Sequence, residues 1–256
     1  MALPDKTLVV LEFFGELGDR RRSEHIQEFN ILLPIYPMTT NTHIENQPQK
    51  NDLLKVPVKI PNTSGDPIDA TIFGNGSNIV ILSNMDPNDW ECWTPLIYEL
   101  VTQGYSVLSY AYKRKGAERL EDLLEVIAFA QHSAFSKMVL VGASRGGVIS
   151  LQAAANNANA KYIVGVAALS APIQYEGVTF YSTEELRSIS VPKLLINSEG
   201  DESANDTRKM GEEFIAPKFV SFYPGHEHGT DILNDPGHKK ALIKELSQFV
   251  SSSFRR

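Results

Sequence analysis

Hydrophobic and polar residues follow two different periods along residues 53–256. Residues 55–60 and 69–73 alternate between apolar and polar side chains, and a turn-rich spacer at 61–66 separates them. This pattern predicts a β-hairpin. The apolar runs that follow are short, continuous and rich in valine, isoleucine and leucine, which is typical of strands buried on both faces. We expect these strands at 78–82, 105–110, 138–141, 162–169, 193–197 and 218–223.

Apolar residues between these runs recur at helical spacing, most clearly at Leu120, Leu123, Leu124 and Ile127. We expect helices at 95–102, 118–132, 148–156, 207–214 and 238–249. A hairpin followed by strands that alternate with helices predicts an α/β fold. We therefore expect a mostly parallel central sheet that starts with an antiparallel hairpin and is flanked by helices on both faces.

Residues 1–50 differ in composition from the rest of the chain. A run of three arginines at 20–22 is followed by a loop-like stretch with several prolines among Asn, Thr and Gln. We interpret 1–50 as an N-terminal extension and 51–256 as one domain. Two interpretations of the extension stay open: a segment that is packed on the surface or partly mobile, and a docking arm for a partner or second subunit.

The 24 basic and 31 acidic residues give a net charge of −7, which argues against a protein that binds nucleic-acid phosphates. The single cysteine, Cys92, excludes an internal disulfide and a cysteine-based zinc site. No apolar run is long enough to span a bilayer, and the first residues lack the features of a secretory signal. We expect a cytoplasmic protein with no membrane partner, either a monomer or a homodimer.

The strongest chemical signal is the run Val-Leu-Val-Gly-Ala-Ser-Arg-Gly-Gly-Val-Ile at 139–149. An apolar strand leads through Gly-x-Ser-x-Gly directly into a helix, which is the pattern of a nucleophile elbow. The tight turn strains Ser144, and glycines at 142 and 146 avoid a clash there. The alternative is a glycine-rich phosphate-binding turn. The spacing matches neither the P-loop nor the dinucleotide fingerprint, so the pattern favours Ser144 as a nucleophile.

A serine hydroxyl needs a base within hydrogen-bond reach, and the base needs an acid to orient it. Asp201 lies four residues past the predicted strand 193–197, at the edge of a parallel sheet where sites gather. We favour Asp201 as the acid. Glu199 and Asp206 are the alternatives, and Asp206 is better suited to cap the next helix.

Two histidines follow the last predicted strand, His226 and His228. We favour His228, which precedes Gly229, as the base, and keep His226 as the alternative. The His-x-His pair could also be a metal site, but no further ligand spacing accompanies it. We therefore expect no metal and no cofactor.

From about residue 55 to 249 the chain resembles the α/β-hydrolase superfamily, most closely its small, lidless dienelactone-hydrolase-like and esterase-like branches. The resemblance rests on Gly-Ala-Ser-Arg-Gly-Gly at 142–147, Ser-Glu-Gly-Asp at 198–201 and Pro-Gly-His-Glu-His-Gly at 224–229. It implies a triad of Ser144, His228 and Asp201 and a mechanism through an acyl-enzyme.

The resemblance also implies an oxyanion hole made of two backbone N–H groups. One belongs to Arg145, directly after the nucleophile, and the other by position belongs to Met85. The loop that carries Met85 lacks the His-Gly pair with which it often begins in the family. A side-chain donor from Asn84 therefore stays open.

The implied activity is that of a carboxylesterase-like serine hydrolase that cleaves an ester or lactone of a small substrate. The segment 170–191 is long enough for a flap but not for a cap domain, so we expect an open pocket. Trp90, Trp93 and Tyr112 either line this pocket or are ordinary core or surface aromatics. The alternatives are a thioesterase, an amidase or a C–C hydrolase with the same triad, and a non-catalytic binding module of the same fold.

Overall fold

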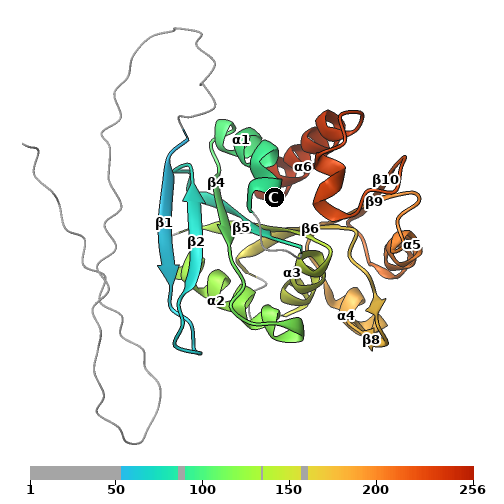
Figure 1. Cartoon of the computed structure of the whole chain (residues 1–256), viewed down its shortest axis with the longest axis horizontal. Coiled ribbons are helices and arrows are strands. Elements are labelled where there is room, and N and C mark those ends of the chain that lie inside the picture. Colours follow the sequence, from blue (N-terminus) through green and yellow to red (C-terminus); the bar gives the residue numbers. More distant parts are fainter. Residues whose placement is uncertain (1–52, 86–89, 134, 157–160) are drawn as a thin grey trace, which may run out of the picture. The chain divides into compact units, whose positions relative to one another are not determined.

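The computed structural model describes residues 53–256, apart from 86–89, 134 and 157–160 (Figure 1). The predicted extension at 1–50 lies outside the described residues. The strands are β1 (Lys55–Ile60), β2 (Ile68–Phe73), β3 (Asn78–Ser83), β4 (Ser106–Tyr110), β5 (Lys137–Ala143), β6 (Ile163–Leu169), β7 (Gln174–Tyr175), β8 (Val178–Thr179), β9 (Lys193–Ser198) and β10 (Lys218–Tyr223).

Eight of these strands form one sheet in the order β1-β2-β4-β3-β5-β6-β9-β10. The strands β1 and β2 form an antiparallel hairpin, and β2 is also antiparallel to β4. All other pairings in this sheet are parallel. The predicted hairpin and the mostly parallel sheet are therefore confirmed. In such a sheet the carboxyl ends of the parallel strands meet at one edge, where the candidate site residues follow.

Helices cover both faces of the sheet, as predicted. In Figure 1, α1 and α6 lie on one face and α2 and α3 on the other. None of the helices among the described residues is sufficiently long and apolar to cross a membrane. The helices are α1 (Thr94–Thr102), α2 (Arg119–His132), α3 (Arg145–Ala155), α4 (Thr183–Ser188), α5 (Ala204–Glu213) and α6 (Lys239–Phe254), with short 3-10 helices at Trp90–Trp93, Gly116–Glu118 and Gly229–Leu233.

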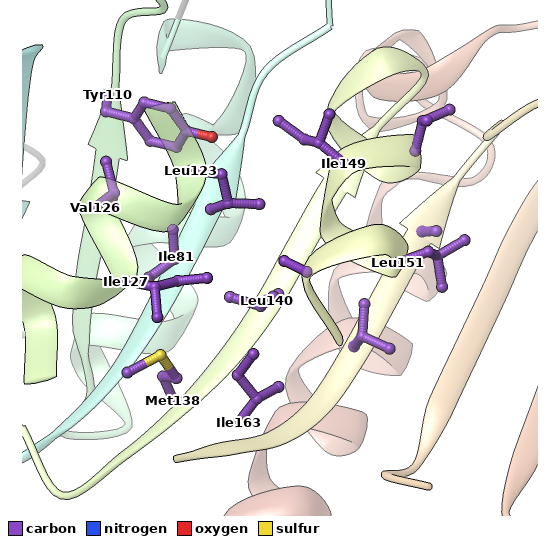
Figure 2. Packing of buried hydrophobic residues seen from close by; sticks show 14 of the residues in the cluster. Ile81, Tyr110, Leu123, Val126, Ile127, Met138, Leu140, Ile149, Leu151 and Ile163 are labelled. Carbon is purple, nitrogen blue, oxygen red and sulfur yellow. The ribbon is translucent and has the colours of Figure 1, made fainter. Parts of the chain in front are cut away.

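The central strand β5 shows how one apolar run serves both layers. Side chains alternate between the faces of a strand. Met138 and Leu140 therefore belong to the cluster beneath α2 and α3 (Figure 2), whereas Val139 and Val141 belong to the cluster beneath α1 and α6. All four side chains have no exposed surface. The strand that leads to Ser144 is thus held rigidly from both sides.

The helix boundaries that differ most from the sequence predictions are those of α3, α5 and α6. The helix α3 begins at Arg145 rather than 148, because Ser144 itself makes the turn from strand to helix. The helix α5 begins at Ala204, where a polar first turn hid it from a search for apolar periodicity. The last helix, α6, extends to Phe254. The earlier starts place Arg145 in the first turn of α3 and Asp206 in the first turn of α5, whereas Ser144, Asp201 and His228 stay in the loops where they were predicted.

The segment 170–191, predicted as a flap, holds a two-stranded hairpin, β7–β8, and the short helix α4. At the hairpin turn, Glu176 and Gly177 both have positive φ, 48° and 79°, as a two-residue turn of type I′ requires. A capping box starts α4, because the Ser182 hydroxyl accepts from the Glu185 N–H while the Glu185 carboxylate accepts from the Ser182 N–H. The segment is a small wall and not a cap domain.

A buried carboxylate ties the loop after β4 to the helix α2. Asp122 has no exposed surface, and its Oδ2 accepts from the backbone N–H groups of Lys113 and Arg114 at 2.8 and 2.9 Å. The Arg114 guanidinium donates to Oδ1 at 2.6 Å and also reaches the turn of the β1–β2 hairpin through Asn62 and Thr63. This one carboxylate therefore joins three separate pieces of chain.

Candidate active site

Ser144 stands between β5 and α3 in a strained backbone conformation. Its φ is 49° and its ψ is −118°, a region that costs a residue with a side chain about 1–3 kcal/mol. The neighbouring strand fixes the turn, because the Ser144 N–H donates to the Leu169 carbonyl at 2.7 Å. The elbow that Gly-x-Ser-x-Gly predicts is present in the structure.

The two glycines of this motif are required by close backbone approaches. A Cβ added at Gly142 would lie 2.1 Å from the carbonyl oxygen of Gly146, and a Cβ at Gly146 would lie 2.1 Å from that of Ser83. Backbone atoms cannot move aside as a flexible side chain can, so only glycine fits at either position. The turn at Ser144 therefore packs closely against the first turn of α3 and against the end of β3.

Asp201 and His228 meet at the carboxyl edge of the sheet. Asp201 follows β9, His228 follows β10, and the Nδ1 of His228 lies 2.6 Å from the Oδ2 of Asp201. The other carboxylate oxygen, Oδ1, accepts from the backbone N–H and the hydroxyl of Ser203 at 2.7 and 2.6 Å. The carboxylate is almost fully buried and the imidazole is partly exposed. This is the arrangement of an oriented general base.

The two groups stabilise each other's charged forms. The hydrogen bond that His228 donates to the Asp201 carboxylate raises the pKa of His228 and outweighs the opposing effect of burial, and the charges of Asp201, Glu202 and Asp231 add to the rise. Burial alone raises the pKa of Asp201, but hydrogen bonds from His228 and Ser203 outweigh it and hold that pKa below its usual value. Asp201 is therefore ionised at neutral pH.

The alternative residues His226, Glu199 and Asp206 are not part of the Asp201–His228 pair. His226 is exposed, and its Nδ1 lies 2.9 Å from the carbonyl oxygen of Gly200. Glu199 is exposed. Asp206 lies in the first turn of α5, where its carboxylate accepts from the Ile173 N–H at 2.8 Å. The prediction that Asp206 caps this helix was wrong, because the cap position belongs to Ser203.

Ser144 and His228 line one cavity of about 620 Å³. Met85 and Arg145, the predicted oxyanion donors, also line it, and the Arg145 guanidinium lies 4.8 Å from the ring centroid of Phe180. The remaining wall comes mainly from the β7–β8 hairpin and the start of α5, and consists of Pro172, Gln174, Tyr175, Glu176, Glu202, Ser203 and Asp206. A flap was predicted at 170–191, but the β7–β8 hairpin within it was not. Gly177, in the hairpin turn, was the one residue in the sequence that could have indicated it.

The three predicted aromatic residues do not line this cavity. Trp93 and Tyr112 are buried against Asn84, whose side-chain oxygen accepts from the Trp93 indole and whose carbonyl accepts from the Tyr112 hydroxyl. Trp90 lines a second cavity of about 500 Å³, together with Asn84. The Asn84 amide group donates to the carbonyl oxygen of Tyr110. Its side chain therefore bridges core residues and does not face Ser144.

Comparison with solved structures shows the same architecture at low sequence identity. An esterase from Pyrococcus furiosus has a TM-score of 0.67 at 15% identity and covers 82% of this chain and 97% of its own. A monoacylglycerol lipase from Paleococcus ferrophilus has a TM-score of 0.62 at 16% identity, with coverages of 73% and 99%. An enol-lactonase from Burkholderia xenovorans has a TM-score of 0.58 at 16% identity, with coverages of 72% and 96%.

The chain has the α/β-hydrolase fold. The resemblance seen in the sequence is therefore confirmed at the level of the fold. No protein-family model and no curated protein sequence matches the chain.

Within the α/β-hydrolase fold the three chemical groups come from three separate strand ends, those of β5, β9 and β10. Among the described residues, no group of three or more His, Cys, Asp or Glu side chains is placed to hold a metal ion. The arrangement provides a hydroxyl and an imidazole at one cavity, and a buried carboxylate that binds the imidazole. What these groups can do together is acyl transfer.

Proposed function

We propose that this protein is a serine hydrolase that cleaves a carboxylic ester or lactone of a small substrate through an acyl-enzyme. The proposal rests on one observation: the imidazole held by Asp201 at 2.6 Å lines the same cavity as the strained Ser144. Esterase, lipase and lactonase structures of the same fold support it.

The mechanism follows from the direction of the hydrogen bonds. Because the Nδ1–H of His228 donates to the Asp201 carboxylate, the Nε2 nitrogen carries the free lone pair. Nε2 takes the Ser144 proton as the oxygen attacks the substrate carbonyl. Nε2 then protonates the leaving group and activates the water that releases the acid. Asp201 stays ionised throughout and stabilises the imidazolium.

The oxyanion of the tetrahedral intermediate is assigned to the backbone N–H groups of Arg145 and Met85. Arg145 is the first residue of α3, so its N–H has no partner within the helix, and the helix dipole favours negative charge there. Met85 lines the same cavity directly after β3. Preorganised donors of this kind contribute the largest share of the rate enhancement in acyl transfer.

The size and openness of the cavity favour small substrates. A volume of about 620 Å³ is in the range of ordinary small-molecule sites, and the β7–β8 hairpin covers only part of it. Short acyl esters and small lactones therefore suit the site better than long lipids. A thioester, amide or C–C bond could react through the same groups, and a binding module would use the same cavity without turnover.

The decisive experiment is a panel of p-nitrophenyl esters of increasing acyl length, combined with labelling by a fluorophosphonate. We expect hydrolysis that is fastest with acetate and butyrate, and covalent label on the peptide that contains Ser144. A folded wild-type protein that takes up no label and hydrolyses none of the esters would exclude the hydrolase and leave the binding module.

The acid limb of the pH profile is a second test. The base must be neutral to accept a proton, and Asp201 holds the pKa of His228 above its usual 6.5. We expect kcat/KM to fall as the pH drops through a value above 6.5. Replacing Asp201 with asparagine removes the charge, so the remaining activity should show its acid limb at a lower pH. Rates measured between pH 5 and 9 would decide, and a limb unmoved in D201N contradicts the assignment of Asp201.

A further inference from the structure

A ring of hydrogen bonds passes through Asp201 and His228, the acid and base of the proposed triad. The peptide bond between His228 and Gly229 closes this ring. The Gly229 N–H, directly after His228, donates to the Ser170 hydroxyl at 2.9 Å. The Ser170 hydroxyl donates to the Oδ1 of Asn197 at 2.8 Å. The Asn197 amide group donates to the Ser203 hydroxyl at 3.0 Å. Ser203 donates to Asp201, and Asp201 accepts from His228, which completes the ring.

The side-chain hydrogen bonds in this ring run in one direction and end at the Asp201 carboxylate. The orientation of the Asn197 amide is fixed, because the backbone N–H of Ser198 also donates to its Oδ1, at 2.8 Å. Its nitrogen must then be the donor to Ser203 and to Thr207. From Ser170 through Asn197 and Ser203, each donor therefore leads to the Asp201 carboxylate. Bonds aligned in one direction polarise each other, so the chain favours the ionised carboxylate.

The ring is buried and comes from three strand ends. Ser170 and Asn197 have no exposed surface, and Ser203 is 5% exposed. The parallel register of β6 and β9 pairs Leu169 with Ile196, which brings the next residues, Ser170 and Asn197, side by side. Buried polar groups of this kind are costly unless every partner is present.

The backbone of Ser170 also has an unusual conformation. Its φ is 49°, a conformation in which glycine is the unstrained residue. Serine at this position is therefore held in a strained backbone conformation. The Ser170 hydroxyl links the loop of His228 to β9, the strand that precedes Asp201, because it binds both the Gly229 N–H and Asn197.

We propose that Ser170 and Asn197 are positioning residues that hold Asp201 and His228 in register with each other. The effect of these residues on catalysis rests on the proposed function. Their effect on the geometry and pKa of the Asp201–His228 pair does not depend on it. Neither residue lines the cavity, so neither is assigned contact with substrate. The loop of His228 is also joined to the loop of Asp201 by the Gly200 N–H, which donates to the Gly225 carbonyl, and by the Ser198 hydroxyl, which donates to the Glu227 carbonyl. The ring adds a buried link at Gly229, the residue directly after His228.

The test is the variant Ser170→Gly, because glycine accepts the positive φ and removes the small side chain that carries the hydroxyl. We expect kcat for p-nitrophenyl acetate to fall about tenfold with KM nearly unchanged, since the two buried hydrogen bonds that join the loop of His228 to Asn197 through Ser170 are lost. We also expect the pKa of His228, followed by NMR of the imidazole, to move down toward its usual value. Asp201, Glu202 and Asp231, the charged groups that raise this pKa, are unchanged in the variant.

The matched control is Ser106→Ala. Ser106 is also buried, and its hydroxyl donates to the Gly76 carbonyl at 2.7 Å at the opposite end of the parallel strands. A Ser170→Gly protein with the kcat and His228 pKa of this control would overturn the proposal. If the wild type hydrolyses no ester, the proposed function fails, but the NMR titration still decides whether the ring holds the pair. An unchanged titration then overturns the ring independently.

Discussion

Replacing Ser144 with alanine lowers kcat/KM for p-nitrophenyl acetate by at least about 10⁴-fold, because no other hydroxyl can take its place at the elbow. Alanine keeps the backbone and removes only the nucleophile. The fluorophosphonate label should be lost in parallel with the activity. Initial rates and intact-protein mass spectra of both proteins, compared at equal concentration, measure the two effects.

The control for this variant is Ser150→Ala. Ser150 lies two turns along the helix that follows the elbow, is fully buried, and its hydroxyl donates to the Gly146 carbonyl within that helix. Its loss should leave the labelling intact. An S144A protein that is folded and retains the wild-type rate would show that the hydrolysis takes place elsewhere and would remove the basis of the mechanism.

Replacing Asp122 with alanine is expected to destabilise the protein by about 3–5 kcal/mol. The variant leaves the backbone N–H groups of Lys113 and Arg114 without their buried acceptor, and each buried donor left without a partner costs about 1–3 kcal/mol. The Arg114 guanidinium loses its shortest bond to a carboxylate but keeps Glu121 and Glu125. Urea unfolding at pH 7 would show the destabilisation as a lower midpoint at an unchanged slope.

Two further variants separate charge from shape in this network. Asp122→Asn keeps the shape of the side chain and one acceptor oxygen. We therefore expect its urea midpoint to lie between those of the wild type and D122A. Asp66 is the matched exposed carboxylate, 3.4 Å from the Lys113 ammonium and 72% exposed. Asp66→Ala should leave the unfolding midpoint unchanged, because surface ion pairs contribute little. Equal midpoints for D122A and D66A would contradict the structural role of Asp122.

Most of the fold could be predicted because its signals are local. Apolar runs bounded by turns marked the strands of the large sheet, and Gly-x-Ser-x-Gly between a strand and a helix marked the elbow. The segment of β7, β8 and α4 could not be predicted in the same way. The strands of this hairpin are two residues long and exposed, and a period cannot be read from two residues.

The candidate site divides along the same line. Asp201 and His228 could be proposed because each follows a strand of a parallel sheet, whose ends converge. Ser170 and Asn197 could not, because a serine and an asparagine near strand ends carry no sequence signature. They meet only through the register of β6 and β9, which depends on the packing of the whole sheet. The direction of the Asn197 amide likewise depends on its neighbours in space.

The β7–β8 hairpin has a consequence for how this protein could acquire new substrates. Its two strands pair only with each other and not with the large sheet, yet they supply part of the cavity wall. A change in the length or sequence of this hairpin would reshape the wall without breaking any bond of the main sheet. Exchange of this short, self-contained insert would thus alter the cavity while Ser144, Asp201 and His228 stay at the strand ends of the large sheet.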